Sequence, residues 1–132
     1  MRGIILIMTF KRDPIKFVRD RAKAKYQKGT ECRICSSTEQ LDFHHFFSLT
    51  PLFNKWLKGN SIKIATDEDV LAVRDQFITE HLPELYDEAV TLCHTHHLKL
   101  HSIYGKDPAL ATAQKQKRWV EIQREKHNER TK

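Results

Sequence analysis

Apolar residues recur at helical spacing near the start of the chain. Ile15, Val18, Ala22 and Tyr26 are three or four residues apart, so they share one face of a helix, while lysines and arginines cover much of the rest. The pattern predicts a helix over residues 13–28 that packs on the protein through a thin apolar stripe.

Polar residues mark both ends of this helix. Asp13 can cap the first turn, and Pro14 suits the first helical position because it has no amide hydrogen to donate. Gly29 is typical of the residue that follows a helix. The basic face of the helix could be a solvated surface, or it could contact phosphate groups.

The middle of the chain predicts two strands with two helices between them. Residues 41–43 have strand character, and a short helix is predicted over residues 51–57. A longer amphipathic helix begins at the capping-box pattern of residues 66–69 and stops before Pro83. Residues 90–92 predict the second strand.

Two further helices are predicted at the end of the chain. Residues 94–103 have a helical pattern that Gly105 closes. Asp107 and Pro108 repeat the cap and proline pattern, so a last helix is predicted over residues 107–126. The expected fold class is therefore α+β and mostly helical.

Two short-spaced ligand pairs predict a structural metal site. Cys32 and Cys35 are separated by two residues, and Cys93 and His96 repeat that spacing. A structural Zn²⁺ takes four Cys or His ligands, often as two such pairs. Three cysteines fit a disulfide framework poorly, so metal ligation in a reducing compartment is the better interpretation. The alternative, three reduced core cysteines, leaves the spacing unexplained.

Five more histidines lie close to these pairs. On a helix, His97 and His101 share a face and can present two imidazoles to one metal ion. Neighbouring strand residues point to opposite sides, so His44 and His45 would differ in role, one as a ligand and the other acting on a nearby water. His94 could compete as a ligand.

Taken together, these motifs resemble the HNH family of ββα-metal nucleases, also known as His-Me finger endonucleases, and especially its zinc-stapled phage and restriction-type members. The resemblance covers residues 30–104 and implies a small ββα-metal core there, within a single nuclease domain of residues 1–132. Residues 46–87 would then be a helical insert that adds core and some substrate or partner contact. The motifs are Cys32-x-x-Cys35, Leu41-Asp42-Phe43-His44-His45 and Leu92-Cys93-x-x-His96-His97-x-x-x-His101.

The resemblance also implies roles for individual histidines. His44, His97 and His101 would bind the catalytic metal ion, and His45 would be the general base that activates water. Mg²⁺ is the expected ion, and histidine ligands would also accept Mn²⁺, Ni²⁺ or Zn²⁺. The structural Zn²⁺ would be separate from this catalytic ion.

Two positions depart from the family pattern. His96 replaces the last of the four zinc-binding cysteines that the family usually has, which imidazole can do. Glu88 stands where the family has a middle Asn that helps to orient the base. Glu88 could hold the base through its other nitrogen, contact the catalytic metal, or mark a weakened enzyme.

The function that the resemblance implies is metal-dependent DNA endonuclease activity, with phosphodiester hydrolysis by a one-metal mechanism. The motifs are equally compatible with nicking or double-strand cleavage, with a monomer or a homodimer, and with homing, restriction, recombination or packaging roles. An alternative is a catalytically inactive, zinc-stabilised DNA-binding module. A third interpretation is a partner-binding protein whose functional surface is the insert.

The charge distribution suits a polyanionic partner. The chain carries 23 Lys and Arg against 17 Asp and Glu, a net charge of +6, and its basic residues concentrate in residues 1–30 and 106–132. A metal site between basic flanks is compatible with DNA binding.

The longest apolar run, residues 4–8, is too short to span a bilayer. We therefore expect a cytoplasmic protein without membrane contact, acting in the host cell if phage-encoded. Met1 and Met8 are both acceptable natural starts.

Overall fold

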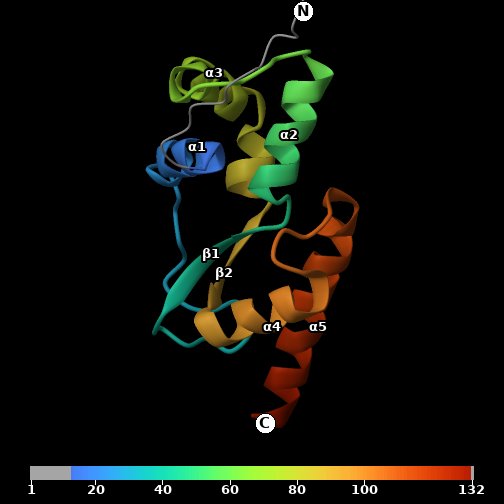
Figure 1. The fold of residues 1–132 in the computed structure, drawn as a ribbon. Helices are drawn as coiled ribbons and strands as arrows, with labels where there is room; N and C mark the ends of the chain where they lie inside the picture. Colours follow the sequence, from blue (N-terminus) through green and yellow to red (C-terminus); the bar gives the residue numbers. More distant parts are fainter. Residues whose placement is uncertain (1–12, 132) are drawn as a thin grey trace, which may run out of the picture.

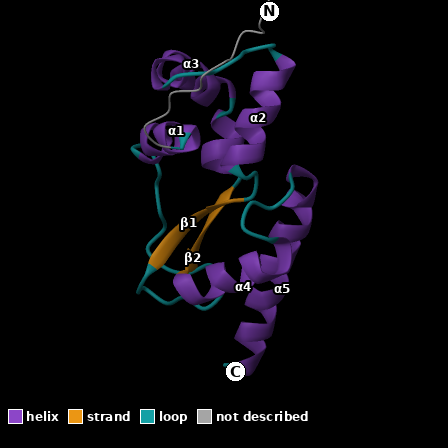
Figure 2. Ribbon diagram, in the orientation of Figure 1, coloured by secondary structure: helices purple, strands orange, loops and turns teal. Residues whose placement is uncertain are grey.

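The fold is α+β and mostly helical, as predicted, and the computed structural model describes residues 13–131 of it. Within this range, helices surround a two-stranded antiparallel sheet (Figures 1 and 2). None of these helices combines the length and apolar character needed to cross a bilayer. The apolar run of residues 4–8 and both candidate start methionines lie outside the described residues.

In chain order the elements are α1 (Pro14–Lys23), β1 (Leu41–His45), α2 (Leu49–Gly59), α3 (Asp67–Glu80), the π-helical turn η1 (Pro83–Asp87), β2 (Ala89–Cys93), α4 (His94–Tyr104), the 3-10 turn η2 (Leu110–Thr112) and α5 (Ala113–Arg130).

The buried apolar side chains gather in two cores. The first lies among α1, α2, α3 and η1, where Val18, Phe53 and Phe77 are almost fully buried. The second lies around the sheet, α4, α5 and the loop before β1, and it includes Leu92 and Val120. Figure 1 shows the strands between these two groups of helices.

The segment between the strands supplies most of the first core. Its helices α2 and α3 are the two that the sequence predicts, and Thr66 caps α3 as the capping box requires. The Thr66 hydroxyl accepts a hydrogen bond from the Asp69 amide at 3.3 Å, and the Asp69 carboxylate accepts one from the Thr66 amide at 3.1 Å. The unpredicted turn η1 then buries Leu85 before β2 begins.

The sheet and α4 form a ββα unit. The strands pair antiparallel with His44 opposite Val90, and β2 leads directly into α4 after Cys93. Because successive strand residues point to opposite faces, His44 faces α4 and α5, whereas His45 faces η1 and the loop after α1.

The first helix is shorter than predicted. It ends at Lys23 and not at residue 28, so Gly29 is not its capping residue. The chain leaves the helix because later residues contact the sheet: the ring of Tyr26 stacks on Phe43 with 4.5 Å between centroids, and the Gly29 amide donates a hydrogen bond to a β2 side chain. Tyr26 therefore packs on the core from a loop.

The last helix also departs from its predicted bounds. It begins at Ala113 instead of Asp107 and continues to Arg130. Pro108 is fully buried where the chain reverses between α4 and α5, and η2 precedes the helix. The cap-and-proline pattern shows only where a helix can start, and packing of the reversal moved the start further along the chain.

Replacing Thr66 with Ala is expected to lower the free energy of unfolding by about 1 kcal/mol, because the Asp69 amide would lose its acceptor. Urea unfolding followed by circular dichroism measures the change. Thr79→Ala, on an exposed position of the same helix, is the control and should leave stability unchanged or slightly higher, since Ala favours helix. An equal loss in both variants would contradict the capping box as the cause.

Candidate active site

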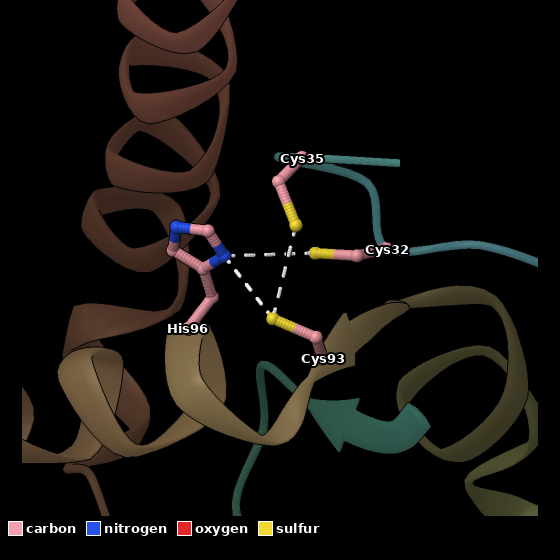
Figure 3. A group of neighbouring side chains, drawn as sticks. All are labelled: Cys32, Cys35, Cys93 and His96. Carbon is pink, nitrogen blue, oxygen red and sulfur yellow. Dashed lines mark hydrogen bonds between the residues drawn. The ribbon is translucent and has the colours of Figure 1, made fainter. Parts of the chain in front are cut away.

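Three sulfur atoms and one imidazole nitrogen converge at the start of α4. Cys32 and Cys35 come from the loop before β1, Cys93 from the end of β2 and His96 from the first turn of α4 (Figure 3). His96 Nδ1 lies 3.2 Å from Cys93 Sγ and 3.8 Å from Cys32 Sγ, and the Sγ atoms of Cys35 and Cys93 are 3.9 Å apart. Zinc bonds of about 2.0–2.3 Å in a tetrahedron place ligand atoms about 3.5–3.8 Å apart, so the spacing fits zinc.

The electrostatics of this group also suit a cation. Burial acts to raise the pKa of Cys32, but backbone hydrogen bonds, including one from the Ile34 amide at 3.4 Å, lower it overall. Burial, and after it the neighbouring Cys32, raises the pKa of Cys35 to about 11. A central cation would remove the repulsion between thiolates and release their protons.

A second group consists of three imidazoles. His44 comes from β1, and His97 and His101 share one face of α4, as their spacing predicts. His44 Nδ1 lies 3.1 Å from His97 Nε2, which lies 2.9 Å from His101 Nε2. Nitrogens bound at about 2.1 Å to one ion are separated by about 3.0–3.4 Å, so these atoms lie close to the spacing of a metal site.

In His97 and in His101, the ring nitrogen that points away from the three-imidazole group has a hydrogen-bond acceptor. His97 Nδ1 lies 3.0 Å from Asp42 Oδ2, and His101 Nδ1 lies 2.7 Å from the Gly105 carbonyl oxygen. Burial acts to raise the pKa of Asp42, but hydrogen bonds from His94 and His97 outweigh it and keep the carboxylate ionised. Each Nδ1 therefore carries the hydrogen, and each Nε2 has a lone pair directed at the group.

The buried amide of Gln116 decides the tautomer of His44. Its Nε2 donates to the Phe46 carbonyl oxygen at 3.2 Å and to the Thr112 hydroxyl at 2.9 Å. With both amide hydrogens used, Oε1 accepts the hydrogen of His44 Nε2 at 2.8 Å, which leaves a lone pair on His44 Nδ1. Three lone pairs thus converge, and they repel one another unless a cation lies between them.

Burial keeps His44 and His97 neutral. It lowers the pKa of His44 to about 3 and lowers the pKa of His97 as well. Neutral imidazole is the form that binds a metal ion. The three imidazoles line a cavity of about 270 Å³ that extends to Arg19 and Lys106.

His45 lines the same cavity from the other face of β1. Burial lowers the pKa of His45 to about 4, while a hydrogen bond to the Leu85 backbone acts in the opposite direction. Its Nε2 atom is buried and has no hydrogen-bond partner within residues 13–131. His45 thus lines the cavity of the three-imidazole group while its Nε2 atom is engaged by none of the described residues.

Comparison with known protein families agrees with a nuclease. The model of the phage T5 nicking endonuclease family, described as a nicking endonuclease family, matches residues 6–131. The chain belongs to this family. Membership confirms the predicted endonuclease class, and nicking implies a DNA substrate, whereas the HNH subtype stays a prediction. No solved structure matches the chain.

Two predicted residues lie elsewhere in this nuclease. The carboxylate of Glu88 forms an ion pair with Lys117 of α5, and it belongs to neither ligand group among the described residues. The Leu85 backbone, not Glu88, forms the hydrogen bond to His45. His94 Nδ1 lies 3.0 Å from Asp42 Oδ2, so His94 helps to hold that carboxylate, and among the described residues it lies outside the three-imidazole group.

The sequence motifs missed Gln116, although the sequence contains a signal for it. Ala113, Gln116 and Val120 are the buried residues of α5, and their spacing of three and four places them on one face. A polar residue on an otherwise apolar stripe needs buried hydrogen-bond partners, and a buried histidine is one such partner.

Gln116→Met is expected to weaken divalent metal binding at the three-imidazole group by roughly 10–100-fold, because His44 would lose the acceptor that holds its tautomer. Isothermal titration with Mn²⁺ measures the affinity. Gln114→Met, exposed on the same helix, is the matched control and should bind like the wild type. If Gln116→Met bound Mn²⁺ with wild-type affinity, Gln116 would not be the residue that holds the His44 tautomer.

Proposed function

We propose that this nuclease is an HNH-type enzyme that nicks DNA by metal-dependent hydrolysis of a phosphodiester bond. The observation that carries the proposal is the convergence of three imidazole lone pairs in a cavity that His45 also lines. The nicking endonuclease family supports a DNA substrate. The HNH subtype is supported by the placement of the histidines on two strands and a helix in ββα order.

His44, His97 and His101 would hold the catalytic ion, since their free lone pairs meet at the spacing of metal ligands. Once bound, Mg²⁺ or another divalent ion would act as a Lewis acid that stabilises charge on the phosphate and on the leaving oxygen. The protein keeps the imidazoles oriented through Asp42 and Gln116, so little reorganisation is needed when the ion binds.

His45 would remove a proton from the attacking water. Its lowered pKa, caused by burial, keeps the imidazole unprotonated at neutral pH, and the Leu85 backbone orients the ring. The buried, unpartnered Nε2 is the atom that would receive the proton. His44 and His45 thus divide ligand and base roles between the two faces of one strand.

Cys32, Cys35, Cys93 and His96 would bind a structural Zn²⁺ that positions the catalytic ligands. His96 and His97 are adjacent on the first turn of α4, so a zinc ion that holds His96 also restrains the helix carrying His97 and His101. For a core of this size, zinc binding would contribute directly to folding.

His45→Ala is expected to lower the nicking rate by about 10²–10⁴-fold, because the water loses its general base. Conversion of supercoiled plasmid to the open circle, in low salt with Mg²⁺, Mn²⁺, Ni²⁺ or EDTA, measures the rate. The variant should retain the wild-type affinity for Mn²⁺, since His45 is not one of the three ligands.

The control is His127→Ala. His127 lies on α5, does not line the cavity and belongs to neither ligand group, so this variant should nick like the wild type. A His45→Ala variant that nicked at the control's rate would reject His45 as the base. Nicking by the wild type that persists in EDTA would reject metal dependence.

Cys35→Ala is expected to abolish zinc retention and lower the free energy of unfolding by about 3 kcal/mol or more, since the metal would lose one of four ligands. Elemental analysis and thermal unfolding measure the two effects. Thr38→Ala, exposed in the loop before β1, is the control. A Cys35→Ala variant with wild-type zinc content and unfolding temperature would remove the structural-zinc proposal.

A further inference from the structure

A large groove opens beside the three-imidazole group. It has a volume of about 750 Å³ and shares Arg19, Lys106, His97 and His101 with the catalytic cavity. Its cationic residues come from α1, from the loop after α1 and from the loop between α4 and α5. The groove therefore runs from the candidate reaction centre between segments that are distant in sequence.

Four basic residues of α1 and the turn after it line two separate surfaces. Arg19 and Lys23, four residues apart, line the groove. Arg21 and Lys25 line a separate depression on another side, where Arg21 Nε lies 2.9 Å from the Asp75 carboxylate. Helix α1 and the turn that follows it thus place one pair of cations at the groove and a second pair, Arg21 and Lys25, away from it.

The groove has a strong excess of positive charge. Arg19, Lys23, Lys28 and Lys106 line it together with a single carboxylate, that of Asp42, which His94 and His97 already engage. Within residues 13–131, no carboxylate forms an ion pair with Arg19 or Lys106. These two cations are available to an anionic ligand at the end of the groove nearest the imidazoles.

The floor between the cations is apolar. Tyr26 and Phe43 stack with 4.5 Å between ring centroids and 17° between planes, and both line the groove. Leu98 of α4 adds an apolar side chain that is 56% exposed. Cationic walls with an apolar floor suit a nucleic acid strand, whose phosphates bind cations while sugars and bases contact apolar surface.

We propose that this groove binds the DNA strand that is nicked, with Arg19 and Lys106 holding the phosphates beside His45 and Lys23 and Lys28 holding those further along. The inference rests on the proposed function, because it assigns a path to the substrate of the same site. It separates the basic residues that bind DNA from those that only make the surface positive.

The test compares two double variants of the full chain with equal charge loss. Arg19→Gln/Lys23→Gln removes both α1 cations from the groove, and Arg21→Gln/Lys25→Gln removes two from the other face. Fluorescence anisotropy with a labelled DNA duplex measures affinity from 50 to 300 mM salt in Mg²⁺. Plasmid nicking is measured in parallel, and thermal unfolding confirms that both variants fold.

Arg19→Gln/Lys23→Gln, by losing two phosphate contacts, should reduce the steepness of the fall of log affinity with log salt by about 2. It should also weaken binding at low salt by roughly tenfold or more. The control pair should keep the wild-type slope. Lys106→Gln should reduce that steepness by about 1 and raise the KM for nicking.

Two outcomes would overturn the inference. If wild type nicks plasmid and binds DNA, but the two double variants lose affinity equally, the groove is not the path and the nuclease assignment stands. If wild type neither binds nor nicks DNA with any of the metals, the proposed function fails and the groove assignment fails with it.

Discussion

The site depends on three imidazole lone pairs that are forced to face one another. Each neutral imidazole donates its single N–H hydrogen to a fixed acceptor: His44 to Gln116, His97 to Asp42 and His101 to the Gly105 carbonyl. None of the rings can relieve the repulsion by changing tautomer without losing a partner. The three rings are therefore held in an arrangement that is favourable only around a cation, as expected of a preorganised metal site.

Elements from both cores of the fold position the histidines of the candidate site. Helix α4 carries His96 of the Cys/His group and two ligands of the imidazole group, so positioning its first turn positions both. The first core reaches the opposite face of β1, where η1 brings the Leu85 backbone to His45. The segment between the strands thus contributes to the orientation of His45 as well as to stability.

The local elements followed from the sequence where one short-range interaction decided them. The Thr66 capping box started α3 at the predicted residue, and the i,i+4 spacing placed His97 and His101 on one face. Predictions of helix ends failed at α1 and α5, because contacts with distant residues decided them: Tyr26 stacks on Phe43, and Pro108 is buried at a chain reversal. Such contacts leave no periodic signal in the chain.

By itself, the sequence determined the chemical types and local spacing of the candidate ligands, since pairs three or four residues apart lie within one turn or on one helix face. Only the tertiary structure decided which residues hold those ligands. Gln116 is 72 residues from His44, and Glu88, which the sequence suggested as a residue that orients His45, pairs instead with Lys117. The groove likewise unites cations from α1 and the α4–α5 loop. Hydrogen bonds and charge clusters across such separations depend on packing, which no local pattern of residues specifies.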